Sequence, residues 1–248
     1  MAAPNYNISI VSHSHGEMVG RLLGDLRNSH PGSPRIILTV NRPEDDRYLE
    51  ALAGFEHEII RNAEPRGFGA NHNAAFARTD EGPFIILNPD IRLPTQFRFD
   101  RFLAAASELG AGVVAPQVRS SSDRLEDSAR RFPNVARLLR RYALNRRECD
   151  YSVNDQPFDV DWVAGMFMAF KRDAFLRIGG FDERYFLYLE DADICRRLWQ
   201  VGERVVYDPR STVIHDAQRA SRRDPQHLSW HFKGMCRFLL KSSTGNLH

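Results

Sequence analysis

The segment "FLYLEDADICRRL" (186–198) carries the strongest sign of chemistry in this chain. Glu190, Asp191 and Asp193 place three carboxylates within four positions, among residues that are mostly apolar. Grouped carboxylates beside an apolar face repel one another and resist desolvation, so we expect a partner that compensates them. That partner is either part of the fold or a substrate, because a carboxylate beside a cleft suits a general base for a hydroxyl nucleophile. The structural alternative is a helix whose first-turn acids stabilise its dipole.

Asp90 and His215 each follow an apolar segment, in "IILNPD" and "TVIH". A carboxylate at the end of a strand can hold a divalent cation through a substrate phosphate, and histidine is a good metal ligand. The alternatives are an ordinary Asn-Pro-Asp turn and a structural histidine.

"RGFGANHN" and "SHSHG" contain weaker candidates. Gly67 and Gly69 open a predicted helix, but the fuller phosphate-binding fingerprint is absent, so a helix-start turn is the alternative. His13 and His15 form an HxH pair, a pattern that binds metal in some hydrolases, although no second ligand cluster follows at the other strand ends.

The elements that must position these residues alternate along the first half of the chain. Apolar runs predict strands at 7–12, 35–40, 57–62, 83–88 and 111–118. Helical spacing of apolar residues predicts helices at 17–29 and 70–78. This alternation predicts an α/β fold with a doubly wound, mostly parallel sheet, in which ligands bind beyond the carboxyl ends of the strands.

The second half begins with a basic, partly amphipathic stretch and returns to strand, turn and helix after residue 157. We expect a helix that starts at the acidic cluster and ends at Gly202, short strands at 204–209 and 211–215, and an amphipathic helix at 225–243. No segment has the composition of a linker. The sequence therefore predicts a single domain (1–248) with a two-part site.

Composition excludes several classes of protein. The 248 residues are 42% hydrophobic and 27% charged, which is typical of a soluble globular protein, and a net charge of +2 gives no sign of nucleic-acid binding. No apolar run reaches the about 18–20 residues that span a bilayer, and no basic region precedes the first apolar stretch, so neither a membrane span nor a signal peptide is expected. Three widely spaced cysteines fit reduced thiols in a cytoplasmic protein.

Taken together, the motifs resemble those of family 2 glycosyltransferases with the GT-A fold, and within them the rhamnosyltransferase-like group. The similar stretches run from "ISIVSHSHGEMVGRLLGDL" through "IIRNAEPRGFGANHNAAFA" and "FIILNPDIRL". The most specific block is "VDWVAGMFMAFKRDAFLRIGGFDERYFLYLEDADICRRLWQVGERVVYDPRSTVIH", which combines a glycine segment, GGFDE, the acidic helix start and a histidine in one order. The resemblance covers residues 7 to 216 except the middle.

The resemblance implies a role for each matching residue. Asp191 matches the catalytic base, supported by Glu190. Asp90 and His215 match a metal site for Mg²⁺ or Mn²⁺, with Asn88 where the commoner DxD motif has its first acid. Acceptor-binding positions are Asp193, Trp162 and Gly165. Nucleotide-sugar-binding positions are Ser12, His13, Asn41, Asn62, Gly67, Asn73 and Asn88.

One departure from the family pattern lies after the second predicted strand. Relatives often place an Asp-Asn pair there, and the Asp helps to hold the base or ribose of the nucleotide. In this sequence Val40 occupies the Asp position and Asn41 remains.

The implied activity is an inverting transfer of a sugar, with L-rhamnose from dTDP-L-rhamnose as the best donor. The acceptor would be a glycan or lipid-linked glycan in bacterial cell-surface polysaccharide synthesis. Residues 7–118 would bind the nucleotide, and residues 119–248 would bind the acceptor and carry the base. Other nucleotide sugars, a metallohydrolase using His13, His15 and His215, and a non-catalytic transferase fold are the alternatives.

Two basic amphipathic stretches predict contact with the inner face of the plasma membrane. The first contains seven cations within eighteen positions: Arg130, Arg131, Arg137, Arg140, Arg141, Arg146 and Arg147. The second is the C-terminal helix, which mixes aromatic and basic residues. Such surfaces suit anionic headgroups, although the same apolar residues can pack on the domain instead.

Overall fold

The structure is a computed structural model that describes residues 6–28, 34–134, 150–216 and 225–244. Its strands are β1 (Asn7–Ser12), β2 (Arg35–Val40), β3 (Glu56–Arg61), β4 (Phe84–Leu87), β5 (Ile91–Arg92), β6 (Ala111–Ser120), β7 (Ala129–Arg130), β8 (Phe158–Asp159), β9 (Trp162–Val163), β10 (Phe167–Phe170) and β11 (Arg204–His215). Its helices are α1 (Gly16–Asn28), η1 (Asp46–Leu52), α2 (Phe68–Phe76), α3 (Phe99–Glu108), α5 (Arg172–Arg177), α6 (Glu190–Gln200) and α7 (Pro225–Thr244).

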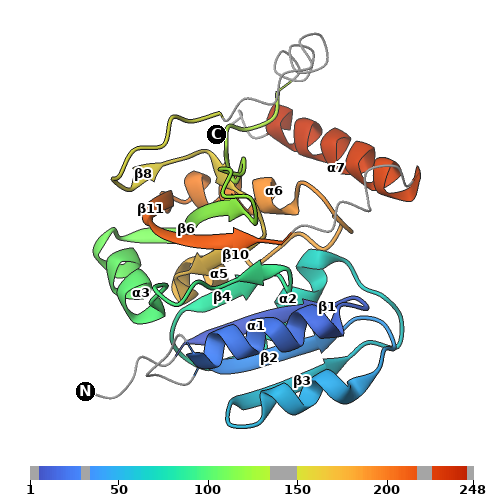
Figure 1. Ribbon diagram of the computed structural model, residues 1–248. Helices are drawn as coiled ribbons and strands as arrows, with labels where there is room; N and C mark the ends of the chain where they lie inside the picture. Colours follow the sequence, from blue (N-terminus) through green and yellow to red (C-terminus); the bar gives the residue numbers. More distant parts are fainter. Residues whose placement is uncertain (1–5, 29–33, 135–149, 217–224, 245–248) are drawn as a thin grey trace.

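Within the described residues, nine strands form one mixed sheet, with the order β3-β2-β1-β4-β10-β6-β11-β5 and with β8 beside β11 (Figure 1). Strands β1 to β4 are parallel, as the alternation predicted. Strand β10 is antiparallel to both β4 and β6, whereas β11 runs parallel to β6. The prediction of an α/β domain with a mostly parallel sheet is confirmed. The short strands β7 and β9 form a separate pair.

One predicted boundary was wrong. The two strands predicted at 204–209 and 211–215 form the single strand β11, which pairs with β6 along its length. The pairing register shifts between Asp208 and Thr212. The break that the sequence suggests at Pro209 is therefore an irregularity inside one long strand.

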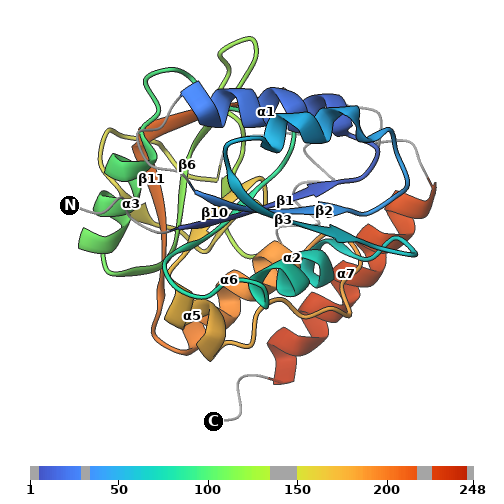
Figure 2. The same cartoon turned by 90° about the horizontal axis from the view of Figure 1, so that it is seen from below.

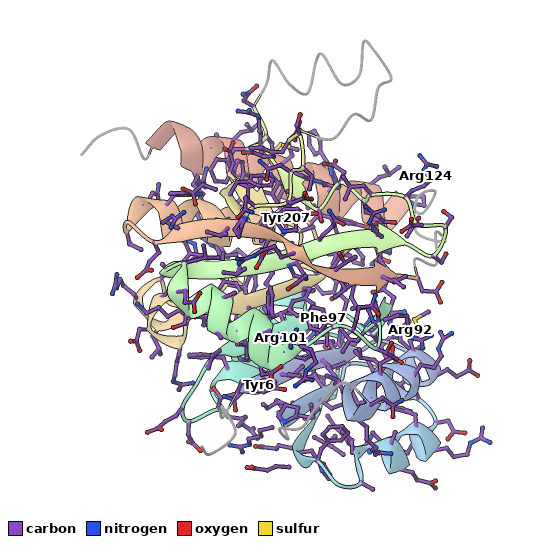
Figure 3. The ribbon with its side chains drawn as sticks, turned by 60° about the vertical axis from the view of Figure 1, so that its left-hand side comes forward. Tyr6, Arg92, Phe97, Arg101, Arg124 and Tyr207 are labelled. Carbon is purple, nitrogen blue, oxygen red and sulfur yellow. The ribbon has the colours of Figure 1, made fainter. Side chains whose placement is uncertain are left out.

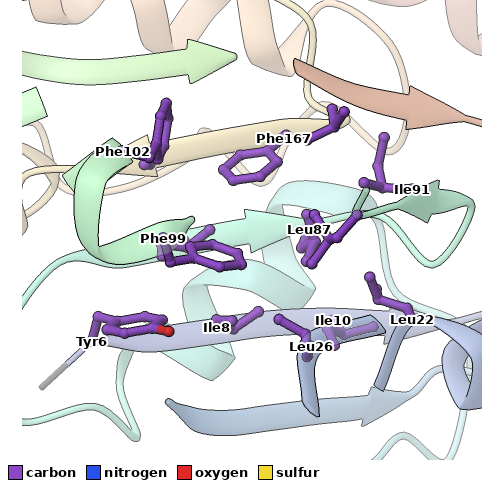
Figure 4. Close-up of a cluster of buried hydrophobic side chains, with 14 of the residues drawn as sticks. Tyr6, Ile8, Ile10, Leu22, Leu26, Leu87, Ile91, Phe99, Phe102 and Phe167 are labelled. Carbon is purple, nitrogen blue, oxygen red and sulfur yellow. The ribbon is translucent and has the colours of Figure 1, made fainter. Parts of the chain in front are cut away.

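Helices cover both faces of the sheet (Figure 2). On one face, α1, η1 and α3 pack on β1, β4 and β10. Helix α1 faces the sheet with buried residues that recur at helical spacing, and Figure 4 shows two of them, Leu22 and Leu26, against Ile10. On the other face, α2, α5, α6 and α7 contribute to a second buried cluster. None of the helices in the described part of the chain is long and apolar enough to span a membrane.

Strand β5 is short, but it determines where one candidate residue lies. Ile91 pairs with His215 at the end of β11, and the N–H of Asp216 donates to the carbonyl oxygen of Asp90 at 2.8 Å. Arg92, labelled in Figure 3, binds Asp25 of α1 at 2.6 Å and so fixes β5 to the helix layer. The ends of β4 and β11 are therefore held together through β5.

Candidate active site

Asp191 lies in the first turn of α6, and two backbone N–H groups bind its carboxylate. Gly165 N donates to Oδ2 at 3.1 Å, and Ala192 N donates to Oδ1 at 2.9 Å. The residue as a whole is of intermediate burial. The helix starts after Leu189, whose φ of 70° is left-handed and which provides no side-chain cap. The two backbone N–H groups thus hold the Asp191 carboxylate in a defined orientation.

Glu190, beside it, has a different environment. Its side chain is buried, with 4% exposure, and its Oε2 atom has no hydrogen-bond partner. Burial, followed by the charge of Asp191, raises the pKa of Glu190 well above its ordinary value. Burial also raises the pKa of Asp191, but the Gly165 amide, the charge of Arg130 and the Ala192 amide oppose that rise. The ionised form is therefore more strongly disfavoured in Glu190 than in Asp191, so Asp191 is the better candidate for a base.

Asp193 is buried inside the fold, whereas the acceptor-binding role expected for it requires a side chain that the acceptor can reach. Its side chain has 0% exposure, and cations of the fold surround it. Arg197 Nε lies at 2.8 Å, Lys241 Nζ at 2.8 Å and Arg196 Nη2 at 3.3 Å from its oxygens. The expectation that a substrate compensates the whole acidic cluster is therefore corrected for Asp193, because α6 and α7 provide its partners.

Arg130 is a neighbour of Asp191 that sequence reasoning had assigned only to a membrane-facing surface. It lies on β7, pairs with Asp127 at 3.2 Å, and stacks over the ring of Trp162 at 5.1 Å. Trp162 is buried and donates from Nε1 to the carbonyl oxygen of Arg131. Pairing of β7 with β9 thus places the cation of Arg130, stacked on Trp162, where its charge acts on Asp191, and no periodic pattern in the sequence indicates this pairing.

Asp90 and His215, which lie 125 positions apart, meet as predicted. His215 Nε2 is 3.0 Å from Asp90 Oδ2, and His215 Nδ1 is 2.8 Å from Glu126 Oε2. Glu126 follows β6 and was not identified from the sequence. Although burial disfavours a charged ring, the hydrogen bonds and charges of Asp90 and Glu126 raise the pKa of His215 to about 9.

Asp90 and His215 provide part of the ligand set that a divalent cation requires. Asp90 Oδ1 is buried and has no hydrogen-bond partner, and an oxygen beside an imidazole nitrogen is a donor set that accepts Mg²⁺ or Mn²⁺ once the ring loses its proton. A second carboxylate on the other ring nitrogen would orient that ring toward the cation. No cluster of three or more ligating side chains was found among the described residues, so substrate oxygens or water would complete the coordination.

The predicted nucleotide-binding residues that follow β1, β2 and β3, which are His13, Asn41 and Asn62, form one hydrogen-bonded network. Asn41 Nδ2 donates to Arg66 O at 3.0 Å, and Asn41 Oδ1 accepts from Arg66 N at 2.8 Å. Asn62 Nδ2 donates to Asn41 Oδ1 and to Asn71 Oδ1 at 2.8 and 2.7 Å. His13 Nδ1 lies 3.1 Å from Asn41 Nδ2. The asparagines therefore hold the loop before α2 against the end of the sheet.

The other predicted residues of this group lie around the same edge. Ser12 Oγ accepts from the N–H of His15, and Asn88 N donates to Met166 O at 2.9 Å. Asn73 binds both backbone groups of Phe181 at 2.9 Å, so it joins α2 to the GGFDE segment. Gly67 approaches the segment before α6 so closely that a Cβ would lie 2.7 Å from Phe186 O.

Two of the three histidines of the hydrolase alternative, His13 and His215, have different partners. His13 contacts Asn41, whereas His215 contacts Asp90 and Glu126. Among the residues that the structure describes, no group of three or more histidine, cysteine or acidic side chains is placed to hold a metal ion. The structure thus offers no support for a three-histidine metal site.

The model of the family described as "Glycosyltransferase like family 2" matches residues 4–237. The chain belongs to this family. It is 30% identical over 249 residues to the rhamnosyltransferase WbbL of Escherichia coli K12, covering 94% of this chain and 92% of that protein. It is 28% identical to the N-acetylglucosaminyl-diphospho-decaprenol L-rhamnosyltransferase of Mycobacterium tuberculosis, covering 95% and 84%.

Solved structures confirm the fold of this family 2 glycosyltransferase. GalNAc-T7 with UDP, GalNAc and Mn²⁺ superposes with a TM-score of 0.68 at 16% identity, covering 95% of this chain. The chain spans about half of that protein, 47% of its length. The mannosyltransferase PcManGT of Pyrobaculum calidifontis, solved with GDP-Man and Mn²⁺, gives 0.63 at 17% identity, with 96% and 65% covered. The GT-A fold expected from the resemblance is therefore present.

In this glycosyltransferase the side chains gathered at one edge of the sheet divide into three groups. Asp191 and Glu190 form a pair of adjacent carboxylates at the start of α6, Asp90 and His215 form a candidate cation site, and Asn41 with its partners shapes the loop before α2. The chemistry that this arrangement supports is deprotonation of a hydroxyl group beside a departing anion.

Proposed function

We propose that this glycosyltransferase moves L-rhamnose from a nucleotide sugar, dTDP-L-rhamnose, to the glycan of a lipid-linked acceptor. The similarity to two rhamnosyltransferases over more than 90% of the chain carries the choice of sugar. The name of the mycobacterial relative specifies an acceptor sugar linked through a diphosphate to decaprenol. Residues 7–118 would bind the nucleotide, and residues 119–248 would bind the acceptor.

Asp191 supports a single inverting displacement. In its ionised form, the Asp191 carboxylate takes the proton of the acceptor hydroxyl as that oxygen attacks the anomeric carbon of the donor. The bond from that carbon to the diphosphate breaks, and the nucleoside diphosphate leaves. A double displacement needs an ionised carboxylate as nucleophile, and burial together with the charge of Asp191 disfavours the ionised form of Glu190.

Asp90 and His215 would hold a divalent cation, which neutralises negative charge on the leaving diphosphate when it is bound. The buried, unpartnered Oδ1 atom of Asp90 is the observation in favour of this assignment. Two proteins of similar fold were solved with Mn²⁺. Glu126 would keep the ring of His215 turned toward the cation through its hydrogen bond to Nδ1.

Turnover of different donors tests the proposal. With a diphosphate-linked N-acetylglucosamine acceptor, dTDP-L-rhamnose should give product, while UDP-GlcNAc and GDP-mannose should give far less. Mass spectrometry would identify the added sugar, and NMR its anomeric configuration. Faster transfer from another nucleotide sugar would overturn the choice of rhamnose but leave a glycosyltransferase.

Calorimetry tests the cation site. Binding of dTDP should be tighter with Mg²⁺ or Mn²⁺ than with a chelator. In the presence of the cation, Asp90→Ala should weaken the binding of dTDP by about 10- to 100-fold. The exposed residue Asp155 provides a matched control, and Asp155→Ala should bind as the parent does. Equal dTDP affinity of the parent with and without cation would contradict a metal-bridged diphosphate.

Membrane contact is the remaining part of the proposal, and α7 is the described surface that supports it. Leu228 and Phe232 are 64% and 70% exposed, close to the basic residue Lys233. An aromatic and basic helix face suits an anionic headgroup layer. Of the first basic stretch, Arg137, Arg140, Arg141, Arg146 and Arg147 lie outside the described residues.

Vesicle co-sedimentation tests this contact. The protein should bind anionic but not neutral vesicles, and high salt should release it. Phe232→Ser with Lys233→Glu should weaken binding by about fivefold or more, since each cation near the surface contributes about 1 kcal/mol. Leu176→Ser is the control, because Leu176 is 54% exposed on α5. An absence of binding at low salt would leave a soluble acceptor.

A further inference from the structure

The turn that leads into α6 has an unfavourable backbone conformation. We call residues 185–190 the base turn, because Asp191 follows them directly. Tyr188 and Leu189 have φ angles of 74° and 70°, and neither is glycine. Residues with side chains adopt this left-handed region rarely, and two in succession persist only where the surroundings enforce them. The N-cap position provides no side-chain hydrogen bond that would do so.

The first turns and the centre of helix α7 contact the base turn. Tyr188 Oη lies 2.8 Å from His227 Nδ1, and the ring of Phe186 stacks on Trp230 with centroids 4.5 Å apart. Gly234 comes so close that a Cβ there would lie 2.7 Å from Tyr188 O. A glycine inside a helix is normally unfavourable, and this close approach gives a physical reason for it.

The far end of α7 is fixed to α6 and to the segment before the base turn. Lys241 Nζ lies 2.7 Å from Asp182 and 2.8 Å from Asp193, and Arg196 donates to Phe238 O at 3.0 Å. The contact residues of α7 recur every three or four positions, so they form one face of the helix: His227, Trp230, Gly234, Phe238 and Lys241.

A second close approach holds the base turn from the other side. The N–H of Phe68, at the start of α2, donates to Phe186 O at 2.8 Å, and Gly67 leaves no room for a Cβ beside the same oxygen. The turn therefore lies between the start of α2 and the middle of α7, both of which are on the same face of the sheet in Figure 2.

We infer that α7 is a positioning element for the reaction: through His227, Trp230 and Gly234 it fixes the base turn, and thereby the orientation of the Asp191 carboxylate. This inference rests on the proposed role of Asp191 as the base. His227, Trp230 and Gly234 act through the backbone of residues 186–190, so they are positioning residues. Loosening them should lower kcat far more than it weakens donor binding, because Asn41 and Asn62 make their hydrogen bonds to Arg66 and Asn71 and not to His227, Trp230 or Gly234.

Gly234→Ala is the sharpest test, because one added methyl group must displace Tyr188. We expect kcat to fall about 10- to 100-fold, the size of effect that a small misplacement of a reacting group produces, with an unchanged KM for the donor. Amide hydrogen exchange in residues 186–191 should accelerate. Gly24→Ala is the matched control: Gly24 is also inside a helix, but no atom lies within 4 Å of its added Cβ, so kcat and exchange should match the parent.

Milder changes keep the test decisive if Gly234→Ala does not fold. Tyr188→Phe removes the hydrogen bond to His227 but keeps the ring, and Trp230→Ala removes the stacked ring, whereas Trp230→Phe retains one. We expect lower kcat for the first two and recovery for the third. Parent-like kcat and exchange in Tyr188→Phe and Trp230→Ala, while Asp191→Asn is inactive, would overturn the role of α7. An active Asp191→Asn would instead refute the base assignment itself.

Discussion

Replacing Asp191 by asparagine should lower sugar transfer by about 10²- to 10⁴-fold, the contribution of a general base, while nucleotide binding survives. Asparagine keeps the shape of the side chain and can still accept an N–H from Gly165 or Ala192, but it cannot take the acceptor proton. Rates of product formation and calorimetry with dTDP measure the two effects separately. Turnover within tenfold of the parent would contradict the assignment.

The pH dependence offers a second readout of the same residue. Because burial raises the pKa of Asp191, the acid limb of kcat/KM should lie above the about 3.9 of an ordinary aspartate. The contribution of Asp191 to activity should be complete at pH values above its raised pKa and should be lost as its carboxylate gains a proton. Asp173→Asn is a suitable control, since Asp173 is an exposed acid in the first turn of α5. It should preserve both the rate and the acid limb.

Replacing Asp193 by alanine should destabilise the protein by about 3–5 kcal/mol, the cost of removing one partner from a buried ion pair. Arg197 and Lys241 would lose a carboxylate at 2.8 Å, in a place where the Asp193 side chain has no exposure to water. For a chain of this size the melting temperature should fall by roughly 6–20 °C. Thermal unfolding followed by circular dichroism measures the change.

The same variant distinguishes a structural Asp193 from one that binds the acceptor. An acceptor-binding residue would leave the melting temperature unchanged and raise the KM for the acceptor. Asp159→Asn is the control for losing a carboxylate in an exposed pair, because Asp159 and Arg204 are 46% and 43% exposed. That change should cost no more than about 1 kcal/mol.

Much of the site could be predicted because it follows from strand ends. Asp90 and His215 were expected to reach one cleft since each follows an apolar strand, and they do meet. Glu126 and Arg130 could not be found in this way. They lie on a loop and on a two-residue strand whose positions depend on pairing with distant segments, and such pairing leaves no periodic pattern in the sequence.

Asp193 was misjudged although the sequence contained the signal. Residues two positions apart on a helix point to different sides, so Asp191 and Asp193 cannot face one cleft together. Arg196 and Arg197 follow Asp193 at three and four positions, the spacing at which side chains on one helix meet. The ion cluster could therefore have been derived once the helix start was fixed. Only Lys241, which α7 brings from the C-terminal end, required the fold.

The pairing of β5 with β11 limits how members of this family can be recombined. A crossover between residues 118 and 119 would follow the proposed division into nucleotide and acceptor parts, yet it would join β5 of one parent to β11 of the other. The contacts of Asp90 with His215 and of Asp90 O with Asp216 N cross that boundary. Chimaeras that exchange acceptor specificity should therefore inherit residues 88–92 and 204–216 from the same parent.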